Sequence, residues 1–199
     1  MRVGVSRETE QRLQAYQRLL RQWTQRINLV SRQSLEDGWQ RHILDCAQIL
    51  QHAPKDWRRW ADLGSGGGLP GIVIAILSLE LAGTREVVLV ESDTRKAHFL
   101  RAALRETGAK AKVINERIEK TAHLAADVIS ARALARLPHL LDLAAPHLSP
   151  GGVCLFHKGQ NAGAELQEAL DRWAFACEKI PSDTDKKAVI LKIGDLQRV

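Results

Sequence analysis

The fold of this 199-residue chain is decided by the stretch Asp62-Leu63-Gly64-Ser65-Gly66-Gly67-Gly68-Leu69-Pro70-Gly71. An apolar run beginning at Trp60 leads into it, and a second apolar run, residues 72–77, follows directly. Glycine is needed where the backbone takes a positive φ or approaches a ligand closely, and proline suits the first turn of a helix. The stretch therefore predicts a β-strand, a glycine loop and an α-helix.

Two ligand-binding patterns overlap in this loop. Residues 66–71 match G-x-G-x-x-G, the dinucleotide fingerprint, which is weak on its own. Residues 62–68 form an acid-x-G-x-G-x-G run, which resembles the cofactor loop of methyltransferases that use S-adenosylmethionine. Both patterns bring a nucleotide-like ligand to the carboxyl ends of parallel strands. An ordinary glycine-rich turn is the third interpretation of the same residues.

Composition sets the class of protein. With 45% hydrophobic and 26% charged residues, the chain has the composition of one medium globular domain, with room for a small appendage. We find neither a membrane-spanning stretch nor a secretory signal and expect a cytoplasmic protein. Cys46, Cys154 and Cys177 share no close spacing, so we expect reduced, buried thiols rather than disulfides or a zinc site.

The net charge of +6 is concentrated near the N-terminus. Residues 1–59 contain 11 Lys and Arg against 6 Asp and Glu. This distribution favours a polyanionic partner such as RNA, although a solvated helix face would produce the same excess.

Two amphipathic helices are predicted at the N-terminus. The first runs from Ser6 to about residue 27, with a stripe of apolar side chains spaced three and four apart: Leu13, Tyr16, Leu20, Trp23 and Ile27. The second begins at an N-cap, Ser34, and runs to about Leu50. Pro54 marks the expected boundary between a basic helical extension, residues 1–53, and the main domain, residues 54–199.

After the glycine loop, strands and helices alternate. We predict strands at residues 87–90, 111–114, 126–130 and 153–156, with helices at 94–107 and 134–148 and a turn at 150–152. Two further strands, around 174–180 and 188–193, close the chain. The prediction is an α/β fold with a doubly wound, seven-stranded sheet.

The residues at the strand ends are the candidate site, because ligands of such sheets bind there: Gly64, Glu91, Glu119, Arg132 and Lys158. An acid in the position of Glu91 accepts hydrogen bonds from ribose hydroxyls in nucleotide-binding folds. Its alternative role is to cap the next helix.

The residue types at these strand ends limit the classes of reaction that the site could catalyse. They carry no thiol for covalent catalysis, no Asn/Asp-Pro-Pro-aromatic motif for amino methylation, and no histidine spacing typical of a metal site. An acceptor that is already nucleophilic, such as N7 of guanine, needs only alignment with a methyl group. Arg132 or Lys158 could read the O6/N7 edge of guanine, whereas a salt bridge from Arg132 to Glu119 or Asp127 is equally compatible with the sequence.

At this point the chain resembles a known family. It carries Asn28-Leu29, Arg41-His42-Ile43-Leu44-Asp45, the run 62–72, Ser130-Ala131-Arg132-Ala133 and Lys158-Gly159 in the order seen in the RsmG/GidB family, bacterial enzymes that make 7-methylguanosine in 16S ribosomal RNA. The resemblance implies a class I methyltransferase fold, Rossmann-like, with an antiparallel last strand and an N-terminal helical extension.

The resemblance also implies which residues form the site. Contacts to S-adenosylmethionine are expected at Gly64, Gly66, Gly68, Leu69, Glu91, Ser92, Asp93, Ile118, Glu119 and Arg132. From their strand-end positions, Arg132 and Lys158 are expected to be catalytic. The resemblance places Asn28, Arg41 and His42 on the RNA side of the cleft. The basic charge of the N-terminal helices adds Arg12, Arg18 and Arg21, which are expected to bind phosphates. No metal is expected.

The sequence therefore predicts an S-adenosylmethionine-dependent enzyme that methylates guanine N7 in 16S ribosomal RNA. We expect a monomer whose partner is the RNA, the small ribosomal subunit or an assembly intermediate, with the target base unstacked. Two alternatives remain open: a nicotinamide-dependent oxidoreductase, and a non-catalytic RNA-binding assembly factor that retains the fold.

Overall fold

A computed structural model describes residues 4–31 and 38–199 of the chain. Its centre is a seven-stranded sheet in the order β3-β2-β1-β4-β5-β7-β6. The strands are β1 (Arg59–Leu63), β2 (Glu86–Val90), β3 (Lys112–Ile114), β4 (Ala126–Arg132), β5 (Leu148–Lys158), β6 (Trp173–Pro181) and β7 (Val189–Arg198). The last strand, β7, is antiparallel to its neighbours β5 and β6, whereas β1 to β5 pair in parallel. The predicted fold class is confirmed.

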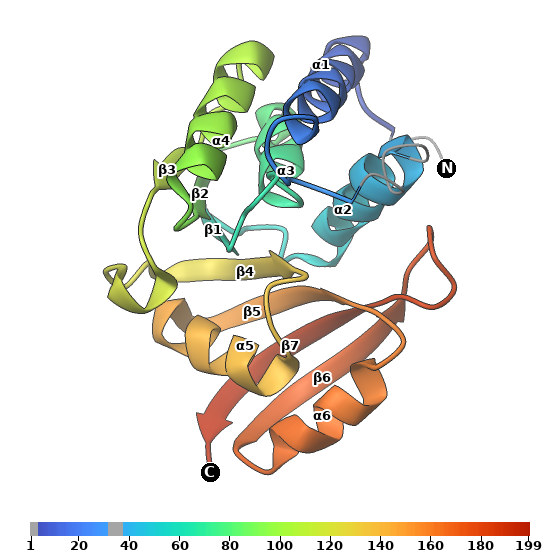
Figure 1. The fold of residues 1–199 in the computed structure, drawn as a ribbon. Helices are drawn as coiled ribbons and strands as arrows, with labels where there is room; N and C mark the ends of the chain where they lie inside the picture. The colour runs from blue at the N-terminus through green and yellow to red at the C-terminus, as the bar shows by residue number, and fades with distance from the viewer. Residues whose placement is uncertain (1–3, 32–37) are drawn as a thin grey trace.

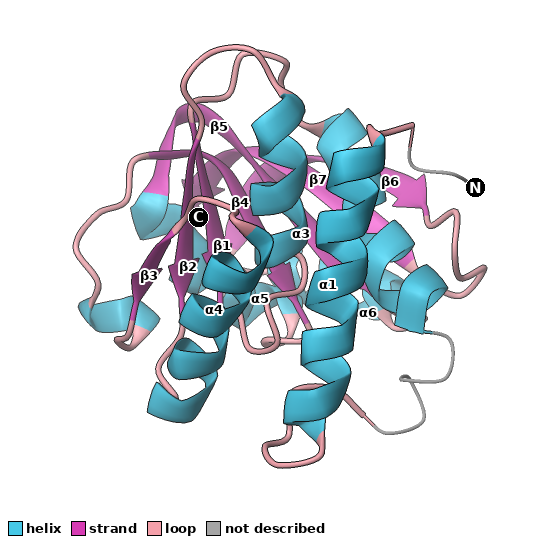
Figure 2. Cartoon of the chain, turned by 90° about the horizontal axis from the view of Figure 1, so that it is seen from above, coloured by secondary structure: helices cyan, strands magenta, loops and turns pink. Residues whose placement is uncertain are grey.

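Helices cover both faces of the sheet (Figure 1). One face carries α1 (Arg7–Thr24), α2 (Asp45–Ala47), α3 (Gly71–Leu77) and α4 (Thr94–Thr107), and the other carries α5 (Leu137–Ala144) and α6 (Ala162–Leu170). Viewed from above, α1, α3 and α4 lie side by side over the strands (Figure 2). Short 3₁₀ turns occur at Ser78–Glu80, Ile118–Lys120 and Ala145–His147. In residues 4–31 and 38–199, no helix combines the length and apolar character needed to cross a lipid bilayer.

The N-terminal helix forms as predicted. Ser6 is its N-cap, where the hydroxyl oxygen accepts a hydrogen bond from the Thr9 N–H at 3.2 Å, and Glu8 and Glu10 lie in the first turn, where the helix dipole favours acids. The apolar stripe buries Tyr16 and Leu20 against α3 and α4 in one hydrophobic cluster. α1 thus shares its core with the sheet it covers.

The second helical segment, defined as residues 39–52, is less regular than predicted. It combines a π-helical turn (Trp39–Leu44), α2 and a 3₁₀ turn (Gln48–His52). The N-cap predicted at Ser34 lies outside the described residues.

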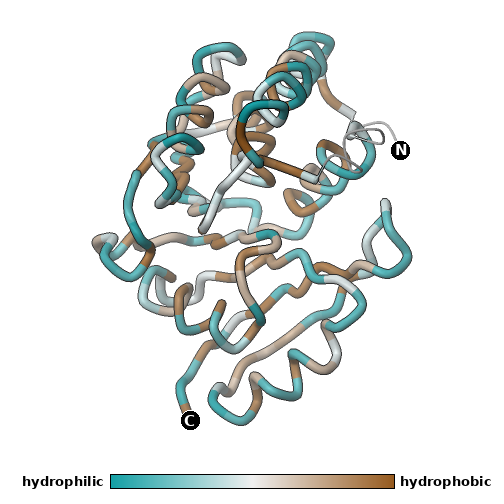
Figure 3. Tube along the Cα trace, in the orientation of Figure 1, coloured by the Kyte–Doolittle hydropathy of each residue, from teal (hydrophilic) through white to brown (hydrophobic). Residues whose placement is uncertain are grey.

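A second cluster, between the sheet and α5 and α6, completes the core. Figure 3 shows the contrast between the helices: α3 is hydrophobic throughout and fully buried, whereas α1 and α4 are hydrophobic on one side only. This difference matches a central helix flanked by two surface helices.

Several local features differ from the prediction. The helix predicted over 134–148 is confined to Leu137–Ala144 and a following 3₁₀ turn, because β5 already pairs from Leu148. The predicted turn at 150–152 consequently lies inside β5, among the extra residues of a register shift between the pairs Ala126–Leu148 and Val128–Val153. No helix was predicted where α6 forms. Cys177 is exposed, since it lies on the edge strand β6, whereas Cys46 and Cys154 are buried.

Candidate functional site

The glycine loop, residues 64–70, joins β1 to α3 at the carboxyl edge of the sheet. Gly64 has φ +64°, and a Cβ atom there would lie 2.5 Å from Leu134 Cδ1. Gly71 begins α3, and a Cβ atom there would lie 2.3 Å from Leu89 Cδ2. The loop therefore needs glycine both for its conformation and for close packing.

Buried polar groups support this loop from below. The Asp62 carboxylate accepts hydrogen bonds from the Ser130 hydroxyl at 2.7 Å and from the Gly71 N–H at 3.3 Å. Burial raises the pKa of Asp62 to about 6, despite the opposing effect of its hydrogen bonds. From α1, the buried Tyr16 hydroxyl donates to the Gly67 carbonyl at 2.5 Å, so the N-terminal helix also fixes the loop.

Glu91 connects the glycine loop to the loop after β2. One oxygen of its carboxylate accepts a hydrogen bond from the Gly66 N–H at 2.7 Å, and the other accepts one from the Asp93 N–H at 2.7 Å. Asp93, rather than Glu91, caps α4, by accepting from the N–H groups of Arg95 and Lys96. Each Glu91 oxygen keeps acceptor capacity for a ligand hydroxyl.

Next to these loops lies the first cavity, which we call the glycine-loop cavity, with a volume of about 360 Å³. Six of the predicted cofactor residues line it: Gly64, Gly66, Glu91, Ser92, Ile118 and Glu119. Gly68, Leu69 and Asp93 do not line it, and Arg132 lines a different cavity. The sequence analysis missed several lining residues, namely Lys96, Glu116, Arg117, Leu134 and His139.

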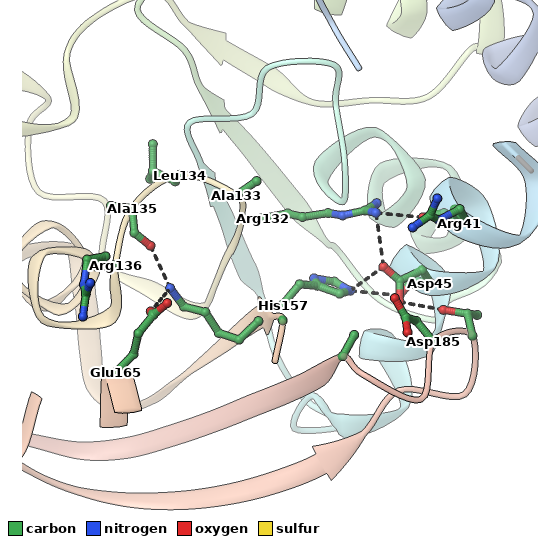
Figure 4. A pocket seen from close by; sticks show the side chains of 14 residues that line it. Arg41, Asp45, Arg132, Ala133, Leu134, Ala135, Arg136, His157, Glu165 and Asp185 are labelled. Atoms are coloured by element: carbon green, nitrogen blue, oxygen red, sulfur yellow. Dashed lines mark hydrogen bonds and ion pairs between the residues drawn. The ribbon is translucent and has the colours of Figure 1, made fainter. Parts of the chain in front are cut away.

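The second cavity, which we call the Arg132 cavity, has a volume of about 440 Å³ (Figure 4). Arg132 extends into it from the end of β4, and its Nη2 donates to the Arg41 carbonyl at 2.8 Å. The ion-pair partner of Arg132 is Asp45, with Nη2 and Oδ2 3.5 Å apart, so the partners suggested from sequence, Glu119 and Asp127, were wrong.

Asp45 is the central acceptor of this region. Its Oδ1 atom accepts hydrogen bonds from Gln48, Ser182 and Thr184 at 2.8 to 3.1 Å. The His157 Nε2 atom lies 2.9 Å from the Asp45 carbonyl oxygen, which can only accept, so this nitrogen carries the proton. Burial lowers the pKa of His157 and keeps the ring neutral.

The Lys158 ammonium is paired and almost fully buried. It donates to the Ala135 carbonyl and to Glu165 Oε2, both at 2.7 Å, and the Lys158 side chain is only 8% exposed. The same Glu165 oxygen accepts the Leu137 N–H at 2.8 Å. Burial alone would raise the pKa of Glu165, but hydrogen bonds from Lys158 and Leu137 lower it below its ordinary value.

The two cavities share a wall. Ala133, Leu134 and Ala135 line both of them, and this segment follows β4 directly. Ligands in the two cavities would therefore contact the same stretch of backbone. Lys158 and Glu165 bond to that stretch and its continuation.

The residues predicted to face RNA do not form one group. Arg18, Arg21, Asn28 and Arg41 are exposed, and Arg41 lines the Arg132 cavity. Arg12 is held by Glu8 and the Thr107 carbonyl.

His42 is buried, at 4% exposure, unlike its neighbour Arg41. Burial, followed by the charges of Arg132 and Arg41, lowers its pKa to about 4. We therefore assign His42 to the support of the second helical segment rather than to its surface.

Signals for the missed residues differ in kind. Asp45 belongs to the Arg-His-Ile-Leu-Asp motif, and Leu134 follows a strand end, so both could have been included. Glu165 and Thr184 had no local signal. Glu165 reaches the site through the packing of α6, and Thr184 through the pairing of β7 with β5 and β6. Within the described ranges, no three His, Cys, Asp or Glu side chains gather as a metal site.

Comparisons with known proteins identify the family of this chain. Residues 9–189 match the family model described as GidB, rRNA small subunit methyltransferase G. The chain is 47% identical over its whole length to the ribosomal RNA small subunit methyltransferase G of Ruegeria sp. (strain TM1040), of which it covers 97%. It is 50% identical to the protein of the same name from Rhodospirillum centenum, over 97% of this chain and 87% of that protein.

Solved structures show the same fold at low identity. An O-methyltransferase from Bacillus cereus in complex with SAH matches with a TM-score of 0.59, 14% identity and coverage of 96% of this chain and 92% of that one. A tRNA (m1A58) methyltransferase from Aquifex aeolicus matches with a TM-score of 0.53, 15% identity and coverage of 77% and 67%. Because the family model matches residues 9–189 and full-length relatives are 47% to 50% identical, we conclude that the chain belongs to the rRNA small subunit methyltransferase G family.

Proposed function

We propose that this protein transfers a methyl group from S-adenosylmethionine to N7 of a guanine in 16S ribosomal RNA. The observation that carries the proposal is the pair of cavities with a common wall, one beside the glycine loop and one beside Arg132. Such a pair suits a donor and an acceptor that react with each other. The names of the relatives supply the acceptor class, ribosomal RNA of the small subunit.

The glycine-loop cavity has the features that a nucleotide-like cofactor requires. Its volume of about 360 Å³ lies within the range of small-ligand sites, roughly 300 to 1,000 Å³. We propose that the Glu91 carboxylate accepts hydrogen bonds from the ribose hydroxyls of the cofactor, and that Ile118 and Glu119 contact its adenine base. Gly68, Leu69 and Asp93 would act indirectly by shaping the loops. S-adenosylmethionine, when bound, supplies an electrophilic methyl group on a sulfonium.

In the Arg132 cavity, the residues would orient the acceptor rather than activate it. Guanine N7 has a lone pair and no proton to remove, so no general base is required. Arg132, whose guanidinium is oriented by Asp45 and the Arg41 carbonyl, would donate to guanine O6. The reaction then depends on proximity and alignment. The buried Cys46, with its pKa raised by burial to about 12, is unsuited to act as a nucleophile.

Charge supports an RNA partner on one face. Helices α1 and α4 carry eight Lys and Arg and three acids, whereas α5 and α6 carry three acids and no Lys or Arg. We propose that residues 1–53 face the RNA, through Arg18, Arg21, Asn28 and Arg41, and that residues 54–199 perform catalysis. We also propose that the enzyme is a cytoplasmic monomer and that it acts on RNA or on a ribosomal particle.

Tritium transfer tests the proposal. The purified protein is incubated with labelled S-adenosylmethionine and either 16S RNA or small subunits from a strain lacking it, and the labelled nucleoside is identified by mass spectrometry. We expect 7-methylguanosine. Label in another nucleoside would overturn the N7 assignment, and cofactor binding without label in either RNA would overturn the substrate. Calorimetric binding of a nicotinamide cofactor in place of S-adenosylmethionine would favour the oxidoreductase.

A further inference from the structure

The segment between the two cavities, residues 133–137, is named here the partition loop. Ala133 has φ +52°, in the left-handed region that residues other than glycine rarely occupy. The next residue, Leu134, places its side chain over Gly64, so close that a Cβ atom there would collide with it. The partition loop is therefore held against the glycine loop in a conformation that its own sequence does not favour.

Two charged side chains hold this loop from the side of the Arg132 cavity (Figure 4). Lys158 donates to the Ala135 carbonyl at 2.7 Å, and Glu165 accepts the Leu137 N–H at 2.8 Å. Across residues 4–31 and 38–199, these are the only side chains that hydrogen-bond to the backbone of the partition loop.

Lys158 and Glu165 act as a unit because they also pair with each other, with Nζ and Oε2 2.7 Å apart. Their side chains are 8% and 15% exposed. A buried pair of this kind tolerates the loss of one partner badly, since the remaining charge is left without compensation. Lys158 comes from the end of β5 and Glu165 from α6, so the pair fastens the loop to two rigid elements.

We propose that Lys158 and Glu165 are positioning residues, which set the distance between methyl donor and guanine by fixing the partition loop. This inference rests on the proposed function and changes the role expected for Lys158: its contacts favour action through Ala135 rather than on the base. Misplacement of reacting atoms by about 1 Å can lower a rate roughly 100-fold, so loosening this loop should affect transfer more than binding.

The test compares Lys158→Met, Glu165→Gln and the double variant with the wild type. Glu178→Gln is the matched control, because Glu178 is an exposed carboxylate on the edge strand β6 and lines neither cavity. Single-turnover transfer to 16S RNA, the dissociation constants of cofactor and RNA, and thermal unfolding are measured for each.

We expect each single variant to lower the transfer rate about 10- to 100-fold, with both dissociation constants changed less than about threefold. The double variant should be no slower than Lys158→Met, because removing both charges leaves none uncompensated. The proposal is overturned if Glu165→Gln transfers like the wild type, if the two losses multiply, or if Lys158→Met acts through RNA affinity alone.

Hydrogen exchange of the Leu137 amide gives a second readout that needs no activity. Its protection should fall in both single variants and persist in Glu178→Gln. Unchanged protection in the single variants would overturn the proposal that Lys158 and Glu165 fix the partition loop. If the wild type transfers no label to RNA, the proposed function fails, while this exchange measurement still decides whether the pair fixes the loop.

Discussion

Arg132 and Asp45 join the end of β4 to the second helical segment through an ion pair with Nη2 and Oδ2 3.5 Å apart. The two residues lie 87 positions apart in the chain, and their side chains are 25% and 9% exposed. Because Asp45 also accepts hydrogen bonds from Ser182 and Thr184, one carboxylate orients the guanidinium and holds the loop between β6 and β7.

The first prediction follows from this arrangement. Asp45→Asn retains the size of the side chain but removes its charge, so Arg132 loses its orienting partner. We expect single-turnover methyl transfer to fall about tenfold or more, which is about 1.4 kcal/mol in the barrier. Asp183→Asn, an equal charge change in the exposed loop that also contacts Gln48, is the control. A wild-type rate for Asp45→Asn would show that Arg132 needs no such partner.

The second prediction concerns the glycine loop. Gly64→Ala adds a Cβ atom 2.5 Å from Leu134 Cδ1 at a residue with φ +64°, so either the loop or Leu134 must move. We expect S-adenosylmethionine affinity to fall at least tenfold in calorimetry. Gly83→Ala is the matched control, since Gly83 has φ +83° but open space around it. It should cost about 1 kcal/mol of stability and leave cofactor affinity unchanged.

Much of the fold could be predicted because its signals are local. The stripe containing Tyr16 and Leu20 has helical spacing, and buried strands such as β2 are continuous apolar runs. α6 was missed because only three of its nine residues are buried, so its apolar helical periodicity is weak. The early start of β5 was missed because Pro150 and Gly151 indicate a turn, yet pairing with β4 continues past them through an irregularity.

Only those site residues could be predicted whose own position in the sequence indicates a role. Strand-end position indicated Glu91, Arg132 and Lys158, but it gave no information on what each side chain would meet. Asp45 and Glu165 reach those side chains through tertiary packing, so no spacing in the sequence encodes the pairs. Because Lys158 bonds to Ala135 and Glu165, we propose that it supports the partition loop rather than contacting guanine.

The third prediction is a pH dependence of stability. Asp62 has an ordinary pKa of 3.8 and a folded-state pKa of about 6, since burial disfavours its charge. Between these values the folded protein holds a proton that the unfolded chain has released. The contribution of Asp62 to stability is therefore greatest below pH 4 and decreases as pH rises to 6, by on the order of 3 kcal/mol.

Asp62→Asn removes this titration and leaves the other groups in place. We expect the difference in unfolding free energy between wild type and variant to shrink, or to change sign, from pH 4 to pH 7 in urea titrations of cofactor-free protein. Altered hydrogen bonds with Ser130 and Gly71 would add only a constant offset. Two stability curves that run parallel across this range would contradict the raised pKa.

The fourth prediction addresses RNA binding by α1. Replacing Arg12, Arg18 and Arg21 together with Ala should weaken binding of 16S RNA and flatten its salt dependence, because each phosphate contact contributes roughly 0.7 to 0.9 to the slope of log K against log salt. Arg12 already bonds to Glu8 and the Thr107 carbonyl, so most of the effect should come from Arg18 and Arg21. The double variant Arg172→Ala, Arg198→Ala removes two charges near Asp142, on the side of α5. It should leave the slope unchanged. Filter-binding titrations from low to high salt measure both variants, and equal slopes for the two would show that net charge, rather than the surface of α1, determines the affinity.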